Sequence, residues 1–253
     1  MKLASLLAVT VALLLAGCGG DEESTMTDTL TVPPATSITD LSVYWLRDGK
    51  VWPVRRWVDA TEATAQAALG ALLAGPTDEE ASADPAFTTA IPEGTEIVDV
   101  IVKDGAATVE LSAELPDEAL AQVTYTVLSQ FLTVDSLEIQ GRNLTRGGFE
   151  SLTPAILVES PLSFEEVSSP LRVTGTANTF EANFQYELTD TDGLIIAEDF
   201  VTATSGTGTR GTFEFTVPFE VKFDGVGALI VFEPSAKDGS RTNLVEIPIR
   251  MKR

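Results

Sequence analysis

The sequence contains no histidine and only one cysteine, Cys18. The absence of histidine excludes the Ser-His and Cys-His machinery of many hydrolases and every metal site that uses a histidine ligand. A single cysteine excludes a disulfide within the chain and leaves no group of thiols for a soft metal. We therefore expect a protein that is not an enzyme and that holds no metal or other cofactor.

Basic residues are also scarce, with 16 Lys and Arg against 38 Asp and Glu and a formal net charge of −22. A chain this acidic is repelled by nucleic acid, so we expect no nucleic-acid partner. One basic cluster stands out: Arg47, Lys50, Arg55 and Arg56. It is either a patch for an acidic partner or a solvated hairpin, and charge runs of this size favour the hairpin.

The segment 1–17 has the form of a signal peptide. Lys2 is followed by an apolar run from Leu3 to Ala16, which is shorter than the roughly 20 residues that span a bilayer. The run closes with Leu15-Ala16-Gly17-Cys18, which resembles the lipobox of bacterial prolipoproteins. The resemblance implies addition of a diacylglyceryl group (with palmitate-type acyl chains) to the Cys18 thiol, cleavage just before Cys18, and attachment to the outer face of the cytoplasmic membrane.

An acidic, polar segment over residues 18–38 follows the lipobox and carries few large apolar side chains. Such a segment buries too little surface to repay the entropy of ordering, so we expect a tether. The remaining residues suffice for two domains. We expect them at 39–145 and 152–253, with a short hinge or a buried junction near 145–151.

Two hairpins are expected in segment 39–145. Asp48-Gly49 separates two β-rich runs within residues 41–58, and Asp104-Gly105 does the same within residues 96–111. An Asp-Gly pair between β-forming runs is a strong hairpin signal, because both residues tolerate the positive φ of a tight turn.

Helices are expected to alternate with these hairpins. The first begins at a capping box formed by Asp59 and Glu62 and stops at Gly75-Pro76. The second covers residues 117–132, and a closing strand covers 136–141. The sequence therefore predicts a compact α+β domain.

The sequence of these elements resembles the GerMN domain of sporulation and spore-germination proteins. The similarity is carried by Leu72-Leu73-Ala74-Gly75-Pro76, by Ile91-Pro92 with Gly94-Thr95, and by Val102 to Ser112 with its Asp-Gly turn. It covers about residues 40–142. The shared residues form helix stops and turns, so the resemblance implies a fold and transfers no catalytic group.

Residues 152–253 show the period of two that is typical of β-strands with one buried face. The alternation is clearest over 180–189 and 213–223, and Pro218 marks an edge or a bend in the second run. Further strands are expected over 156–158, 171–175, 194–203, 228–232 and 244–249. About seven short strands predict an all-β, two-sheet sandwich.

This half is similar to the immunoglobulin-like domain of bacterial spore-germination proteins. Ser169 to Ala177, Asp192-Gly193 and Phe232 to Ser240 carry the similarity, which covers about residues 155–250. The resemblance implies a lipoprotein of the Gram-positive envelope in which an α+β GerMN domain precedes an immunoglobulin-like sandwich.

Three sharper motifs are better explained as turns or chance. Gly206 to Gly211 matches G-x-G-x-x-G, but a dinucleotide site needs a helix after it, and an alternating strand follows here. Asp190-Thr191-Asp192-Gly193 has two carboxylates of a calcium loop and lacks the glutamate at position twelve. The adjacent acids Glu79-Glu80 and Glu165-Glu166 are candidates for glycoside hydrolysis only if a cleft brings them together.

The sequence favours a non-catalytic envelope module that binds one or more proteins, with an assembly role implied by the sporulation resemblance. The alternative is a module that binds a cell-wall glycan or another small ligand. Trp45, Trp52 and Trp57 lie within one hairpin and are the natural stacking surface for such a ligand. The competing interpretation is that these three side chains pack against the first helix.

Overall fold

The computed structural model describes residues 38–253, which lie in one compact unit. The predictions of a signal peptide, of lipidation at Cys18 and of a tether fall outside these residues. None of the helices found between residues 38 and 253 has the length and apolar character needed to cross a membrane.

The first hairpin is longer than the sequence pattern suggested. Strands β1 (Ile38–Arg47) and β2 (Lys50–Asp59) pair without interruption from Arg47 opposite Lys50 to Ile38 opposite Asp59. Asp48 has a φ of 52 degrees and Gly49 a φ of 70 degrees. A tight turn with two left-handed residues requires such positive angles. A short strand, β3 (Phe87–Thr88), pairs with the other edge of β1.

The predicted capping box at Asp59 and Glu62 is wrong. Asp59 is the last residue of β2, where strand pairing holds it extended, and α1 (Thr64–Leu73) begins after Ala63 without a side-chain cap. The stop at Gly75 is confirmed by its positive φ. A capping box does occur in the acidic segment that follows, where Thr77 and Glu80 cap the short helix α2 (Asp78–Ala81).

The second hairpin opens a four-stranded sheet. Strands β4 (Ile97–Lys103) and β5 (Ala106–Leu111) are antiparallel, and α3 (Asp117–Leu128) then returns the chain to a parallel strand, β6 (Ser136–Ile139). The predicted strand at 136–141 stops at Ile139, because Gln140 and Gly141 adopt positive φ and turn the chain into β7 (Arg142–Leu144). The sheet order is β4-β5-β6-β7.

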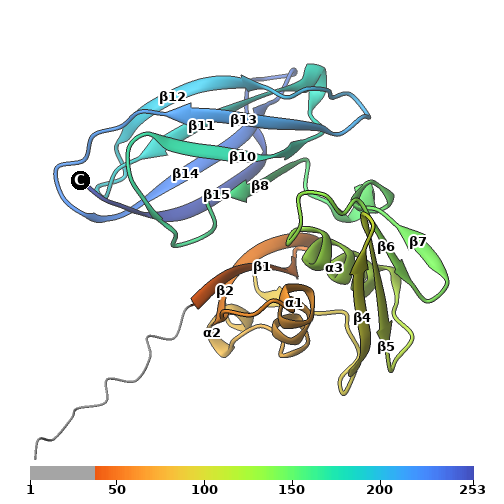
Figure 1. The fold of residues 1–253 in the computed structure, drawn as a ribbon. Coiled ribbons are helices and arrows are strands. Elements are labelled where there is room, and N and C mark those ends of the chain that lie inside the picture. The colour runs from red at the N-terminus through yellow and green to blue at the C-terminus, as the bar shows by residue number, and fades with distance from the viewer. Residues whose placement is uncertain (1–37) are drawn as a thin grey trace, which may run out of the picture. The chain divides into compact units, whose positions relative to one another are not determined.

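Helices α1 and α3 lie between the β1–β2 hairpin and this sheet (Figure 1). Their apolar side chains fill one hydrophobic core with residues of both sheets, including Trp45, Leu69, Leu120 and Leu137. Helix α3 is buried almost all round, which explains why it carries few charges beyond its first turn. The α+β architecture predicted for this half is confirmed.

Two facing β-sheets form the second half. One has the order β13-β10-β8 and the other the order β12-β11-β14-β15-β9. The strands of the first sheet are β8 (Ile156–Ser160), β10 (Leu171–Ala177) and β13 (Gly211–Val217). Those of the second are β9 (Glu166–Val167), β11 (Asn183–Thr189), β12 (Ile195–Thr202), β14 (Gly225–Pro234) and β15 (Arg241–Met251). This is the predicted sandwich, with the short strand β9 in addition.

Aromatic side chains join the two sheets. Phe184 of β11 meets Phe213 of β13 edge to face with ring centroids 4.9 Å apart, and Tyr186 stacks on Phe215 at 4.8 Å. These contacts arise from the alternation that predicted the strands, since alternate residues of a strand point to one face. The second hydrophobic core lies between the sheets and includes these aromatic residues.

The alternating pattern predicted two strands that are longer than those observed. Phe180 lies in the short 3-10 turn η2 (Phe180–Ala182) and is exposed, because positive φ at Glu181 and Ala182 breaks the extended backbone there. Phe223 is also exposed, since β13 ends at Val217 immediately before Pro218. Proline lacks the N–H that a continuing ladder needs.

Candidate functional site

The junction between the two hydrophobic cores holds the polar networks that bear most directly on function. It is built on η1 (Arg146–Leu152), a 3-10 segment in the stretch where the sequence allowed a hinge. Phe149 of this segment is buried in the first core, while the neighbouring Glu150 faces the second half. Phe149 is the one buried residue of this segment, so η1 is a largely exposed connection that contacts the first core through Phe149 and the second half through Glu150.

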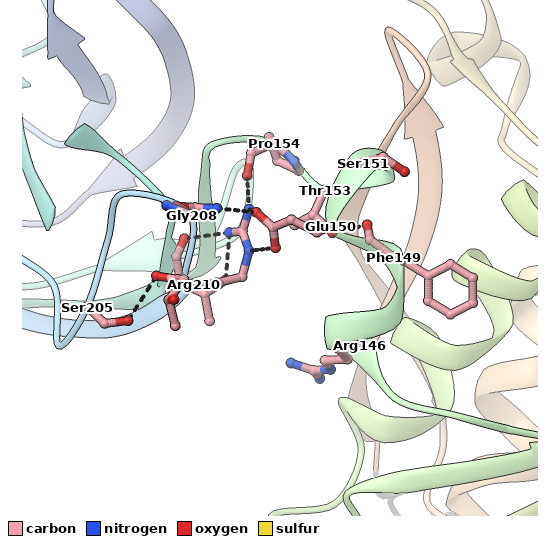
Figure 2. A network of polar contacts seen from close by, with 12 residues as sticks. Arg146, Phe149, Glu150, Ser151, Thr153, Pro154, Ser205, Gly208 and Arg210 are labelled. Atoms are coloured by element: carbon pink, nitrogen blue, oxygen red, sulfur yellow. Dashed lines mark hydrogen bonds and ion pairs between the residues drawn. The ribbon is translucent and has the colours of Figure 1, made fainter. Parts of the chain in front are cut away.

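Arg210 is the centre of one polar network at this junction (Figure 2). Its guanidinium donates two hydrogen bonds to the Glu150 carboxylate, Nε to Oε2 at 2.8 Å and Nη2 to Oε1 at 3.0 Å, and a third to the Pro154 carbonyl at 2.8 Å. Asn178 completes the network by donating to Glu150 Oε1 at 2.8 Å and by accepting from the Gly208 N–H at 2.8 Å. A bidentate Arg–carboxylate pair of this kind fixes orientation as well as charge.

The Arg210 hydrogen bond holds the pKa of Glu150 below its usual range, against the opposing effect of partial burial. Glu150 is therefore ionised at neutral pH, and the pair is a charged clamp between the junction segment and the loop before β13. A general acid would instead require a substrate-facing carboxyl with a raised pKa, so this carboxylate has the character of a structural group.

A second polar cluster connects β1, η1 and β8. The Tyr44 hydroxyl donates to Glu159 Oε1 at 2.9 Å, and Arg146 Nη1 donates to the same oxygen at 2.7 Å. Burial, followed by the nearby negative charge of Glu159, raises the pKa of Tyr44 well above its ordinary value. Tyr44 is thus a neutral hydrogen-bond donor at physiological pH and lacks the low pKa that would make it a nucleophile.

A groove of about 610 Å³ opens beside this cluster. Tyr44, Arg146 and Glu159 form its polar wall, and Phe131 and Leu132 form part of its apolar wall. Arg146 and Glu159 are already paired with each other. The groove therefore has a mixed lining in which polar groups slightly outweigh apolar ones, and its Arg146–Glu159 pair is already neutralised.

Two arginines of the basic cluster form ion pairs with glutamates of the two adjacent acidic pairs. Arg55 pairs with Glu165 at 2.8 Å, Arg56 pairs with Glu80, and Lys50 donates to the Ser151 carbonyl. These basic side chains therefore have partners within the chain, and so do Glu80 and Glu165. The contacts favour neither a basic patch for an acidic partner nor a pair of catalytic carboxylates.

The three tryptophans do not form one stacking surface. Trp45 and Trp52 are direct cross-strand partners, but Trp45 is fully buried in the first core and stacks under Arg56, 4.2 Å from the ring centroid. Trp52 is half-buried and packs against the second core. Trp57 is 66% exposed. It lies an odd number of positions from Trp52 in the same strand and so points to the opposite face.

The remaining motifs also have structural explanations. Asp190 Oδ1 accepts hydrogen bonds from the backbone N–H groups of Asp192 at 2.9 Å and Leu194 at 3.0 Å, so this carboxylate stabilises its own turn. The residues from Gly206 to Arg210 form a loop that leads into β13, as expected. No group of three potential metal-ligating side chains is found among residues 38–253.

The edges at β4 and β12 are among those that present apolar side chains to solvent. Strand β4 ends the four-stranded sheet and strand β12 ends the five-stranded sheet. On β12, Phe200 is 68% exposed, and the adjacent Asp199 carboxylate accepts a hydrogen bond from the Phe200 N–H at 2.8 Å. Strand β4 shows the same arrangement, with Asp99 accepting from the Val100 N–H at 2.9 Å. On both edge strands, an aspartate carboxylate thus accepts a hydrogen bond from the backbone N–H of the next residue.

Comparisons with known protein families match both halves of the chain. Residues 42–143 match the family described as sporulation and spore germination. Residues 155–240 match the immunoglobulin-like domain of bacterial spore germination. No curated protein matches the chain.

Several solved structures are similar over part of the chain. The tandem GerMN domains of the sporulation protein GerM from Bacillus subtilis are 24% identical, with a TM-score of 0.35 over 44% of this chain and 42% of that one. The first GerMN domain of the same protein is 25% identical, with a TM-score of 0.31 over 42% and 86%. A Clostridium perfringens protein described as a lipoprotein is 14% identical, with a TM-score of 0.28 over 47% and 93%. The present chain thus spans less than half of the tandem GerMN structure.

Proposed function

We propose that this chain, which carries a sporulation and spore germination domain followed by an immunoglobulin-like domain of bacterial spore germination, is a non-catalytic envelope lipoprotein that binds other proteins. Lipidation of Cys18 would hold it at the outer face of the cytoplasmic membrane. Its folded part would then act in the assembly or support of an extracytoplasmic complex.

The observation that supports this proposal is the pair of open sheet edges. An unpaired strand offers a row of backbone donors and acceptors, and proteins normally shield such rows because they recruit other chains. Here the edges combine these groups with exposed apolar side chains, which is the combination used when a partner adds a strand.

Site-specific photocross-linking in the native host tests this function. A photoreactive phenylalanine analogue in place of Phe200 on β12 should capture one envelope protein reproducibly, because a partner strand would lie within reach of that side chain. The matched control places the analogue at Phe223, which is 74% exposed but lies in the loop between β13 and β14, outside both edges.

Cys18→Ala serves as the second control, since it removes the proposed lipid anchor and should abolish the capture along with membrane attachment. Equal capture from Phe223 and Phe200, or capture of nothing from Phe200, would count against strand-edge recognition. Persistent membrane attachment of Cys18→Ala would overturn the anchor.

A glycan-binding role has one specific observation in its favour. A groove of about 480 Å³ is lined by Trp52, Arg47 and Lys50. An indole ring beside hydrogen-bond donors suits a sugar. However, Arg47 already stacks on Trp52 at 4.8 Å from the ring centroid.

Titration with soluble peptidoglycan fragments separates the two functions. Saturable binding that Trp52→Ala abolishes, at an unchanged melting temperature, would favour the glycan role. A lower melting temperature without any ligand effect would assign Trp52 to packing.

A further inference from the structure

The free edge of β4 carries an unusual amount of apolar surface. Val98 is 58% exposed and Ile101 is 51% exposed, and Val102 beside it is also exposed. Within residues 38–253 the strand pairs only with β5, so its outer edge has no strand partner. An edge of this composition requires either protection or a partner.

The turn at the end of β4 fixes which residues face the open edge. Lys103 is opposite Ala106 across the turn Asp104-Gly105, and the closing hydrogen bond of such a turn directs the Lys103 carbonyl toward β5. In an antiparallel strand, the backbone N–H and C=O groups of alternate residues point to the same side. The backbone groups of Ile101 therefore also bond to β5, whereas those of Val100 and Val102 point to the open edge. The bond from the Val100 N–H to the Asp99 side chain agrees with this assignment.

The charges on β4 are unbalanced within one copy of the chain. Asp99 lies directly opposite Glu110 on β5, and like charges in that relation destabilise a strand pair. Among the ion pairs of the described residues, those of the first half do not include Asp99. Lys103, further along the same face of β4, has only an exposed contact with Asp104 at 3.7 Å.

We propose that the outer edge of β4 binds the β4 strand of a second copy of this chain in antiparallel register about Ile101. This register places Val100 opposite Val102 of the second copy, with both residues directing backbone groups into the new ladder. On pairing, the Val100 N–H exchanges its bond to the Asp99 carboxylate for a bond to the Val102 carbonyl of the second copy, which releases Asp99. The register also places Asp99 opposite Lys103 of the second copy, and Lys103 opposite Asp99 of the second copy. The two ion pairs flank a central contact between the two Ile101 side chains.

Charge complementarity selects a second copy as the occupant. The order Asp99, Ile101, Lys103 on one face is self-complementary under a two-fold rotation, which gives each charge an opposite charge across the new pair. Strand β12 provides a contrast, because its exposed Glu198 and Asp199 have no cation in the strand and would repel their own copies. We therefore expect β4 to pair with itself and β12 not to do so.

The contact is short, since it involves only segment 99–103 of each strand. The net charge of −22 opposes association over longer distances. The pairing is therefore weak in dilute solution. Attachment of both copies to one membrane raises their effective concentration, which favours pairing without any new contact. This inference deepens the proposed function, on which it rests, by naming one protein partner.

Disulfide trapping of the full chain in a Cys18→Ala background tests the pairing, at a protein concentration high enough to offset the loss of the proposed anchor. Ile101→Cys places two thiols in a non-hydrogen-bonded cross-strand pair about 4.5 Å apart between Cα atoms, a separation that a disulfide spans. Phe200→Cys on β12 is the matched control, because it also replaces an exposed apolar residue of an edge strand. We expect the Ile101→Cys chain to form the covalent dimer about tenfold faster under mild oxidation.

Charge exchange makes the test specific. In the Ile101→Cys background, Asp99→Lys alone and Lys103→Asp alone should each slow dimer formation to the control rate, because like charges then face each other across the axis. An equal mixture of the two variants should recover the fast rate as a mixed dimer. Circular dichroism verifies that each variant is folded.

Equal rates for Ile101→Cys and Phe200→Cys, or no recovery in the mixture, would overturn β4 self-pairing. That result would leave capture of an envelope protein from position 200 intact. Conversely, self-pairing with no captured partner would keep this inference and remove the wider interaction role.

Discussion

At the scale of single residues, Arg210 connects several separate segments. Its guanidinium contacts the junction segment through Glu150, the linker through the Pro154 carbonyl, and β10 through the Thr176 carbonyl at 3.3 Å. The Arg210 side chain is mostly buried, whereas Glu150 keeps 40% of its side chain exposed. Truncation of Arg210 removes the donor from the Glu150 carboxylate and from the Pro154 and Thr176 carbonyls, and a lost hydrogen bond to a charged group costs roughly 1.5–3 kcal/mol.

Arg210→Ala is therefore expected to lower the free energy of unfolding by about 2 kcal/mol. Arg172→Ala is the matched control. Arg172 also donates two hydrogen bonds to a glutamate, Glu214, but both side chains are exposed to solvent. Water and salt screen that pair, so the control should melt like the natural chain. Urea denaturation of both variants measures the difference, and equal losses would show that the Arg210 network is not a clamp.

The ionisation of Glu150 gives this network a pH signature. Its pKa in the folded chain is lowered from the ordinary value of 4.5, chiefly by the Arg210 hydrogen bond. The stabilisation is therefore fully present above the unfolded pKa and is lost as pH falls through the lowered folded pKa. We expect the stability difference between the natural chain and Glu150→Gln to be constant near neutrality and to shrink as the pH drops below 4.5. Urea melts at a series of acidic pH values test this, and a difference independent of pH would contradict it.

At the scale of secondary-structure elements, two glycines differ in the space available for a side chain. A Cβ on Gly175 in β10 would overlap the Leu157 carbonyl oxygen of β8 and would lie 2.6 Å from the Phe213 ring. Gly70 on the exposed face of α1 has no atom near its Cβ position.

Gly175→Ala should therefore destabilise the sandwich by about 2 kcal/mol, because backbone and ring must both shift. Gly70→Ala should stabilise the chain by about 0.5 to 1 kcal/mol, since alanine loses less entropy in a helix than glycine. Thermal melts of the two variants provide the measurement. Shifts of the same sign would refute the packing explanation.

The elements that the sequence predicted well are those with a local cause. Asp48-Gly49 and Asp104-Gly105 form turns whose geometry these two residue types favour on their own. The alternation in β11 and β13 reports a buried face directly. Asp59 misled the prediction because its state is decided by pairing with Ile38, at the far end of the hairpin's other strand, which a capping motif does not reveal.

The candidate surfaces were harder to foresee than the fold. Three tryptophans in one hairpin suggested a single surface, yet strand parity and two separate cores distribute Trp45, Trp52 and Trp57 among three environments. The open edges of β4 and β12 are properties of sheet order, which no local pattern in the sequence encodes. The Arg210–Glu150 pair was missed for the same reason, as its partners meet only when both halves have folded.

At the scale of the whole molecule, the two hydrophobic cores share residues across the junction. Leu157 of β8 belongs to the first core, and Trp52 of the first hairpin packs against the second. Arg55 and Glu165 add an ion pair between the same halves. From this interlocking we expect the halves to unfold together rather than as independent domains.

Trp45→Ala tests that coupling, because Trp45 contributes to the first core alone. The change should lower the free energy of unfolding by about 3 to 5 kcal/mol. If the halves are coupled, native-state hydrogen exchange should speed up by similar factors in α3 and in β14 of the second sheet. Faster exchange confined to the first half would show that the junction does not transmit stability. Trp57→Ala, an exposed change in the same hairpin, should alter neither region.

Strand β9 pairs in parallel with the far end of β15, where Glu166 lies opposite Arg250 and Val167 opposite Met251. This contact joins segments that are remote in sequence, and Ile249 and Met251 are fully buried in the sandwich. A ribosome that has released only β8 to β14 has not yet supplied the strand that closes the sandwich. High contact order of this kind slows folding, so we expect β8 to β14 to remain without their partner strand until β15 has been synthesised. A late-closing sandwich of this kind would suit the export that we propose for this chain, because an unfolded half could pass a translocation channel before it closes.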